Sequence, residues 1–284
     1  MALKCGIVGL PNVGKSTLFN CLSNAKAQSA NFPFCTIEPN VGVIAVPDDR
    51  IQHLVELCNP KSVVPATVEI VDIAGLVKGA SKGEGLGNKF LANIRETDAI
   101  LHVVRCFDND NIVHVDGSVD PVRDIEVINT ELQLKDLETV ESRLARTEKA
   151  AKAGGDKNAK ALLGVLQKAR EALLAGRNVR SVELETEEEE RMMRELMLLT
   201  AKPVLYVCNV GEESAASGNE YSRRVEELAK AEGASTLIVA AAAEADITEL
   251  DTEEERAEFL QELGLETSGV ARLIRAAYAL LGLQ

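Results

Sequence analysis

The stretch Gly9-Leu-Pro-Asn-Val-Gly-Lys-Ser16, close to the start of the chain, constrains the fold more than any other feature of the sequence. It matches the phosphate-binding P-loop pattern G-x-x-x-x-G-K-[ST]. An apolar segment of strand character, residues 3–8, precedes it, and apolar residues at helical spacing follow it from Thr17. A glycine turn between a strand and a helix is the context that this motif requires, so a chance match is the weaker interpretation. The chain is therefore expected to bind a nucleotide.

The residues of this loop have separate expected tasks. Backbone N–H groups of the loop and the positive end of the following helix would face the phosphates. Lys15 is expected to reach the β- and γ-phosphate oxygens, where it stabilises charge during catalysis, and the Ser16 hydroxyl to ligate Mg²⁺. We assign nucleotide contacts to six consecutive residues: Asn12, Val13, Gly14, Lys15, Ser16 and Thr17.

Two later segments supply the rest of the predicted phosphate site. Thr36 lies in a segment without regular period and could bring a second hydroxyl to Mg²⁺, although taken alone it reads as a plain surface threonine. The apolar segment 68–71 ends in Asp72, and Asp72-Ile-Ala-Gly75 fits the pattern D-x-x-G. A carboxylate at this strand tip can hold Mg²⁺ through water, and the Gly75 N–H can bond the γ-phosphate. We therefore assign Ser16, Thr36 and Asp72 to the metal and Gly75 to catalysis.

The residue after Gly75 bears on how hydrolysis could occur. Small GTPases of the Ras type carry a Gln there that orients the attacking water. This chain has Leu76, which cannot hydrogen-bond to water. His114, in the polar loop that follows the apolar strand 99–107, could replace the Gln, because α/β sites form at the carboxyl edge of the sheet. From the residues alone, an exposed loop histidine without a role is the favoured alternative.

A helical hairpin is predicted between residues 125 and 198. Apolar residues recur at three- and four-residue spacing in two runs, separated by Gly154-Gly155-Asp156. They are Ile128, Leu132, Leu134, Leu137, Val140 and Leu144, then Leu162, Val165, Leu166, Ala169 and Leu173. This pattern indicates two antiparallel helices with a seam like that of a coiled coil. We expect residues 1–124 and 199–284 to form the nucleotide-binding domain, with 125–198 inserted into it.

The sign of the charge reverses along this hairpin. Ten Lys or Arg and three Asp or Glu lie between Arg143 and Arg180, in a chain whose net charge is −14. A solvated helix face is the ordinary interpretation of a charge run, and contact with RNA or another acidic surface is an equal alternative for a projecting hairpin.

The segment that would read the base departs from the usual GTPase motif. Asn209-Val210-Gly211-Glu212 follows an apolar strand at 204–208, where N-K-x-D is typical, and residues 241–244 are expected to form a second loop beside the base. Val210 replaces the Lys, and Glu212 is one methylene longer than the Asp that pairs with guanine. A guanine site loses selectivity when this acceptor is displaced, so adenine becomes plausible, read by backbone carbonyls or by Asn209.

Composition excludes several classes of protein. Aromatic residues make up 3% and Trp is absent, which argues against a single-strand binder that stacks bases. The six cysteines show no metal-like spacing and are typical of reduced thiols in a cytoplasmic protein. We expect no signal peptide and no membrane contact, because a strand begins at once and no long apolar run occurs.

Together, the segments 9–16, 31–36, 72–75 and 209–212 and the hairpin between the fourth and fifth strands resemble the Obg-like ATPases of the YchF type, which belong to the translation-factor-related P-loop class. The resemblance covers nearly the whole chain. It implies an α/β P-loop NTPase fold, or G domain, with a mostly parallel sheet flanked by helices and an inserted helical hairpin.

The same resemblance implies a cytosolic, Mg²⁺-dependent hydrolase that prefers ATP to GTP and associates with ribosomes. It implies that Leu76 is the hydrophobic replacement of the catalytic Gln and that His114 is the candidate substitute. Members usually continue into a small β-rich TGS domain, whereas this sequence stops at Gln284, which leaves ribosome binding less supported than nucleotide binding.

Three functions follow as alternatives: slow ATP hydrolysis to ADP and phosphate by a monomer, a true GTPase switch, and a non-catalytic module in which nucleotide sets the pose of the basic hairpin on RNA or the ribosome.

Overall fold

The computed structural model describes residues 3–28, 41–48, 50–73, 86–154 and 157–282. Thr36, Gly75 and Leu76, to which the sequence assigns roles, lie outside these ranges. In the described part of the chain, no helix is both long and apolar enough to cross a lipid bilayer.

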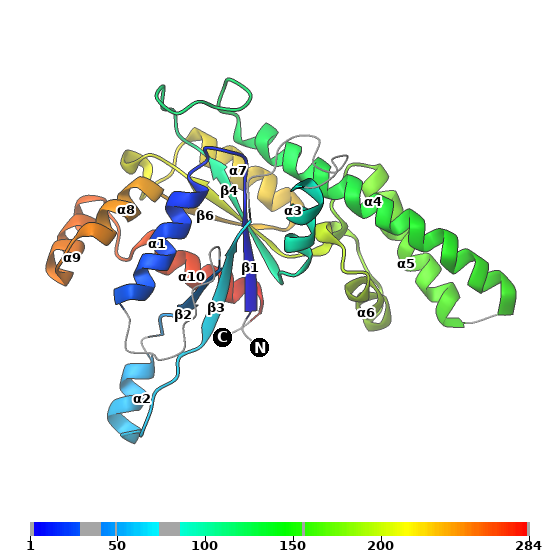
Figure 1. Cartoon of the computed structure of the whole chain (residues 1–284), viewed down its shortest axis with the longest axis horizontal. Coiled ribbons are helices and arrows are strands. Elements are labelled where there is room, and N and C mark those ends of the chain that lie inside the picture. Colours follow the sequence, from blue (N-terminus) through cyan, green and yellow to red (C-terminus); the bar gives the residue numbers. More distant parts are fainter. Residues whose placement is uncertain (1–2, 29–40, 49, 74–85, 155–156, 283–284) are drawn as a thin grey trace.

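A six-stranded sheet forms the centre of the molecule, in the order β2-β3-β1-β4-β5-β6 (Figure 1). Only β2 is antiparallel to its neighbour, β3. The bounds are β1 Leu3–Val8, β2 Val41–Ala45, β3 Thr67–Asp72, β4 Ala99–Arg105, β5 Val204–Asn209 and β6 Ser235–Val239. Every residue of β4 and β5 is buried, as expected for central strands of a parallel sheet that is covered on both faces.

Helices cover both faces of the sheet. One face is packed by α1 and α10, and the other by α7 and the beginning of α4. The helices are α1 Lys15–Gln28, α2 Arg50–Cys58, α3 Leu86–Arg95, α4 Pro121–Gly154, α5 Lys157–Leu174, α6 Glu187–Glu195, α7 Glu220–Glu232, α8 Ala241–Glu249, α9 Glu253–Glu262 and α10 Gly269–Leu280. Short 3₁₀ turns occupy Val179–Ser181, Leu199–Ala201 and Glu212–Ser214.

Helices α4 and α5 form the predicted hairpin, which projects away from the sheet with α6 beside it (Figure 1). Its own apolar core includes Val140, Val165, Leu166 and Met193. Leu134, expected in the seam, is instead 43% exposed. The mostly parallel sheet, its flanking helices and this hairpin confirm the predicted fold class.

The division into two domains stays a prediction, and α4 passes through residues 124 and 125 as one continuous helix. Buried polar contacts hold the hairpin to the sheet. Asp136, 0% exposed, accepts hydrogen bonds from the backbone N–H groups of Leu199 and Thr200 and from the Thr200 hydroxyl. The carboxylate of Glu232 accepts bonds from Arg180 and from the Tyr206 hydroxyl.

Candidate nucleotide-binding site

The P-loop joins β1 to α1 at the carboxyl edge of the sheet, and its backbone conformation needs particular residues. Gly14 has a φ of +91°, and a Cβ built there would lie 2.1 Å from Asn209 Nδ2. Asn12 also takes a positive φ, 63°, which Asn tolerates better than most side chains. Ser16 and Thr17 are exposed at the first turn of α1, whereas Val13 is buried beneath the loop.

An ion pair joins the two phosphate-site motifs. Lys15 Nζ lies 2.6 Å from Asp72 Oδ1, and the two side chains are 10% and 18% exposed. Sheet register explains this meeting, because Ile7 near the end of β1 pairs with Asp72 at the end of β3. The structure thus brings together a predicted phosphate ligand and a predicted metal ligand that lie far apart in the sequence.

The residues that the sequence assigns to Mg²⁺ offer the right kind of donor atoms. Asp72 supplies a carboxylate and Ser16 an exposed hydroxyl, and Mg²⁺ prefers such oxygen ligands. The Asp72 oxygen bonded to Lys15 would have to exchange this partner for one on the nucleotide or metal. The chemistry of these two residues therefore fits a magnesium–triphosphate group.

Asn209 ties the phosphate side of the site to the base side. Its Nδ2 donates to Val13 O at 2.9 Å, and its Oδ1 accepts from the Ala241 N–H at 3.0 Å. Both polar atoms of this buried amide are therefore engaged in holding loops. The reading of adenine by Asn209, one of the two options that the sequence leaves open, stays a prediction, and these contacts show that the amide also bridges the two loops.

The other residues of the altered base motif differ in exposure. Val210 is buried, and its N–H donates to Val239 O, so its side chain packs in the core. Glu212 is exposed in the turn that follows. The prediction of a loop at residues 241–244 is wrong, because α8 begins at Ala241. Its first three residues are alanines, which favour helix strongly.

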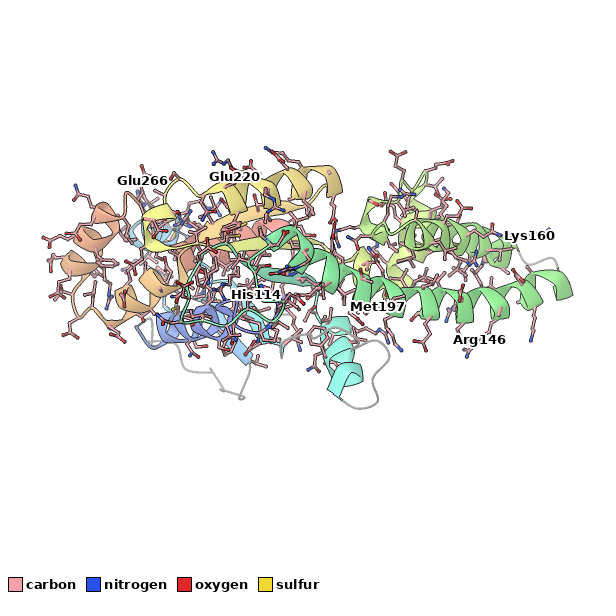
Figure 2. All side chains as sticks on the ribbon, turned by 90° about the horizontal axis from the view of Figure 1, so that it is seen from above. His114, Arg146, Lys160, Met197, Glu220 and Glu266 are labelled. Atoms are coloured by element: carbon pink, nitrogen blue, oxygen red, sulfur yellow. The ribbon has the colours of Figure 1, made fainter. Side chains whose placement is uncertain are left out.

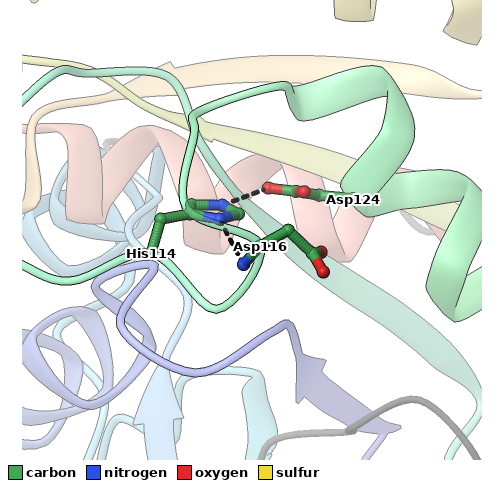
Figure 3. Close-up of side chains that lie close together, drawn as sticks. All are labelled: His114, Asp116 and Asp124. Carbon is green, nitrogen blue, oxygen red and sulfur yellow. Dashed lines mark hydrogen bonds and ion pairs between the residues drawn. The ribbon is translucent and has the colours of Figure 1, made fainter.

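His114 is buried, which contradicts the expectation of an exposed loop histidine: the residue is 8% exposed. Its Nε2 lies 2.8 Å from Asp124 Oδ2, and its Nδ1 accepts from the Asp116 N–H at 3.1 Å (Figure 3). The loop also contacts the P-loop, because Asn12 Nδ2 donates to Val113 O at 3.1 Å. His114 therefore stands beside the phosphate site with both ring nitrogens engaged.

Arg123 completes this cluster. Its guanidinium lies 3.1 Å from Asp124 Oδ1 and 3.8 Å from Asp116 Oδ2. Among the described residues, His114, Asp116 and Asp124 are the group whose ligand atoms lie close enough, within 4.8 Å, to hold a metal ion. The single cation of Arg123 pairs with both carboxylates and so already balances part of their charge.

Sequence reasoning missed Arg105, Arg123 and Asp124. Arg105 is 2% exposed and donates to three backbone carbonyls in the loop before His114, at Phe107, Asn109 and Ile112, and so fixes the path of that loop. The pattern Asp120-Pro121, typical of a helix start, could have placed α4 correctly. No local pattern signals the pairing of Asp124 with His114.

Only some of the basic residues of the hairpin are without an ion pair to a described residue. Lys168, Arg170 and Arg180 pair with Glu189, Glu141 and Glu232 respectively. Exposed basic residues without an ion pair to any described residue are Arg143, Arg146, Lys149, Lys160 and Arg177. Figure 2 shows Arg146 and Lys160 toward the far end of the hairpin and His114 near the sheet.

A hollow of about 450 Å³ lies between α4, α5 and α6. Arg143, Arg146 and Arg191 line it together with apolar side chains that include Leu162 and Met192. Two of the unpaired basic residues of the hairpin, Arg143 and Arg146, thus lie at the same hollow.

The chain is similar to known proteins over its whole length. The family model described as 50S ribosome-binding GTPase matches residues 4–148. The ribosome-binding ATPase YchF of Escherichia coli O157:H7 is 58% identical over 284 residues, which cover 100% of this chain and 77% of that protein. The protein of the same name from Bacillus subtilis is 56% identical, with the same coverage of both chains.

A solved structure agrees with the fold over nearly the whole chain. The structure of the Schizosaccharomyces pombe YchF GTPase has a TM-score of 0.84 and 38% sequence identity, and the match covers 98% of this chain and 75% of that one.

Proposed function

Because this chain belongs to the YchF family of ribosome-binding ATPases, we propose that it hydrolyses ATP to ADP and phosphate, prefers ATP to GTP and depends on Mg²⁺. The observation that carries the proposal is the ion pair between Lys15 and Asp72 at the mouth of the P-loop. It brings one cation for the phosphates and one carboxylate for the metal to the same edge of the sheet, next to the amino end of α1.

The protein groups of this site act mainly by electrostatic stabilisation. Lys15 and the amides of the loop from Asn12 to Thr17 would hold the phosphate oxygens where negative charge develops. Mg²⁺ held by Ser16, Thr36 and Asp72 would neutralise part of that charge. The Gly75 N–H would bond the γ-phosphate and so detect its loss.

His114 is the proposed group that orients the attacking water in place of the missing Gln. Its loop is anchored to the P-loop through Asn12 and Val113, which supports a position near the γ-phosphate. Both ring nitrogens form hydrogen bonds, so one of these bonds must break before His114 can bind the water.

The choice of nucleotide rests on the base-side residues. Val210 is buried, and Glu212 is the acceptor that would meet the base edge. Asn209 supports this side by holding Val13 and Ala241 in place. A GTPase is the second candidate, because the yeast structure and the family model are both described by that activity.

The partner proposed for the hairpin is the ribosome, through its RNA. Arg143 and Arg146, which line the hollow between α4, α5 and α6 and form no ion pair with a described residue, are suited to phosphate groups. We propose that residues 125–198 act as this contact domain, that residues 1–124 and 199–284 carry the nucleotide, and that the protein works as a cytoplasmic monomer. Hydrolysis would then switch the pose of the hairpin.

The test compares ATP and GTP directly. We would measure the dissociation constants of both nucleotides, with Mg²⁺ and with a chelator, and phosphate release in single turnover, with Lys15→Ala as the control. Tighter ATP binding and release above the control rate are expected. Release equal to the control would leave only a nucleotide-binding module, and a large preference for GTP would favour the GTPase alternative.

A further inference from the structure

The hydrogen bonds of His114 determine where its proton lies. The backbone N–H of Asp116 can only donate, so His114 Nδ1, 3.1 Å away, must accept and carries no proton. The single proton of the neutral ring is therefore on Nε2, which donates to Asp124 Oδ2 at 2.8 Å. Figure 3 shows the ring held between these two groups.

The two partners of the ring differ in how firmly they are held. Asp124 is 2% exposed and lies in the first turn of α4, which begins at Pro121 after Asp120. Arg123 donates to Asp124 Oδ1 from Nε and Nη2, at 3.3 and 3.1 Å, and to Ser118 O. The Asp124 carboxylate is thus fixed by a helix and an arginine.

The Asp116 N–H, by contrast, belongs to an exposed turn. Val115 and Asp116 are the central residues of this turn, which is closed by a bond from the Gly117 N–H to His114 O. Val115 is 54% exposed and the Asp116 side chain 43% exposed. Rotation of the peptide between these two residues would free Nδ1 while the bond from Nε2 to Asp124 stays in place.

We propose that Asp124 is a positioning residue for hydrolysis: it holds the proton of His114 on Nε2, so that Nδ1 is the atom that accepts a hydrogen bond from the attacking water. The inference rests on the proposed role of His114 and adds to it the working nitrogen and the residue that selects it. The same division of labour between a buried Asp and a His operates in serine protease triads.

Replacing Asp124 by Asn tests this assignment because Arg123 dictates how the amide must lie. The two donors of Arg123 require an acceptor at the Oδ1 position, so the Asn oxygen faces Arg123 and its NH₂ faces His114. Since NH₂ can only donate, His114 Nε2 must accept and the proton moves to Nδ1, which requires the Asp116 N–H to turn away from the ring. Asp124→Asn is nearly isosteric and reverses the tautomer.

The experiment combines nitrogen NMR of the imidazole rings with kinetics on the full chain. The sequence has three histidines, so loss of one signal in His114→Ala assigns the ring. We expect a protonated Nε2 in the parent and a protonated Nδ1 in Asp124→Asn. Turnover of ATP should fall at least about tenfold while KM changes less than about twofold.

Two further variants separate positioning from a structural role. Adding Arg123→Met to Asp124→Asn removes the constraint on the amide, and the tautomer and part of the turnover should return. Combining Asp124→Asn with His114→Ala should be no slower than His114→Ala alone. Asp110→Asn removes the same charge from an exposed position of the same loop and should leave both readouts unchanged.

Each failure has its own meaning. A proton on Nδ1 in the parent overturns the assignment, and this measurement needs no variant of Asp124 to fold. If His114→Ala slows hydrolysis but Asp124→Asn does not, positioning by Asp124 is wrong and the proposed role of His114 stands. If His114→Ala hydrolyses ATP at the parent rate, both the proposed role of His114 and positioning by Asp124 are wrong.

Discussion

The Nζ atom of Lys15 lies 2.6 Å from Asp72 Oδ1, so the cation expected on the phosphates is paired with the carboxylate expected on the metal. A bound nucleotide must break this ion pair, and its phosphates then replace Asp72 as the negatively charged partner of Lys15. Mg²⁺ in turn replaces Lys15 as the positively charged partner of Asp72. Binding of both together is therefore favoured over binding of either alone.

Asp72→Asn should separate the binding of the nucleotide by Lys15 from the binding of Mg²⁺ by Asp72. Without the carboxylate, Lys15 is free, so the affinity for ATP in the presence of a chelator should stay the same or rise. The gain in affinity on adding Mg²⁺ should disappear, and hydrolysis should fall by about two orders of magnitude or more because transition-state charge is no longer neutralised. Titration of labelled ATP with and without Mg²⁺ measures both. Equal weakening under the two conditions would contradict the assignment of Asp72 to the metal.

Gly14→Ala should disrupt the site locally. Its φ of +91° strains any L side chain, and the new Cβ would lie 2.1 Å from Asn209 Nδ2. We expect a loss of about 1–3 kcal/mol in the free energy of unfolding, with nucleotide binding lost or greatly weakened. Chemical unfolding and ATP titration check the two effects.

A matched control for this variant is available in α5. Gly164 lies within the helix, and a Cβ there would meet nothing within 4 Å. Gly164→Ala should raise the free energy of unfolding by up to about 1 kcal/mol and leave ATP binding intact. A loss of stability in this control would mean that alanine substitution as such, rather than the conformation at Gly14, is harmful.

Glu212→Asp should move nucleotide choice toward guanine. The shorter side chain restores the acceptor that pairs with guanine N1–H and N2–H₂, so the ratio of GTP to ATP affinity should increase by about tenfold. Competition of labelled ATP by each nucleotide gives this ratio. Glu213→Asp, at the neighbouring exposed position, is the control and should leave the ratio unchanged. An unchanged ratio in Glu212→Asp would remove Glu212 from the base site.

His102 should make the protein lose stability in acid. Burial in β4, assisted by the nearby positive charge of Arg180, lowers the pKa of His102 from 6.5 to about 3. The unfolded chain therefore takes up this proton first, and stability is lost as the pH falls from 6.5 toward 3, by about 1.4 kcal/mol per pH unit. His102→Phe keeps a ring against Tyr206 and should flatten the profile in this window. Chemical unfolding at several pH values is the measurement; an identical slope in the variant would assign the acid loss to other groups.

Reversing two charges on the hairpin should weaken the ribosome contact. Arg143 and Arg146 line the hollow between α4, α5 and α6 and form no ion pair with any described residue. The double variant Arg143→Glu/Arg146→Glu should lower co-sedimentation with ribosomes at least about tenfold and reduce the salt slope of binding by about two. Arg223→Glu on α7 is the control. Binding equal to that of the parent would assign ribosome contact to another surface.

The sequence was enough to place the P-loop and Asp72 at the same edge of the sheet, because each of these motifs is local. The P-loop follows β1 and Asp72 ends β3, and these two strands are parallel neighbours, so knowing the strands is enough to bring their ends together. The roles of Thr36 and Gly75 stay predictions, since these residues lie outside the described ranges.

What the sequence could not predict depends on contacts between distant residues. The burial of His114 follows from Asp124 and from Arg105, which shapes the preceding loop, and neither has a signature of its own. The hairpin likewise appears more basic in the sequence than it is in the structure. Arg180, for example, pairs with Glu232, which comes from α7, so only the fold could show that this charge is already matched.

Helix α4 joins the candidate site to the hairpin. Its 34 residues form one rod about 50 Å long, with Asp124 in the first turn and Arg146 near the other end. Between them, Asp136 accepts hydrogen bonds from the backbone N–H groups of Leu199 and Thr200, which attach the middle of the helix to the 3₁₀ turn before β5. One continuous helix therefore connects the outer end of the hairpin to the carboxylate that holds His114, with no loop between them.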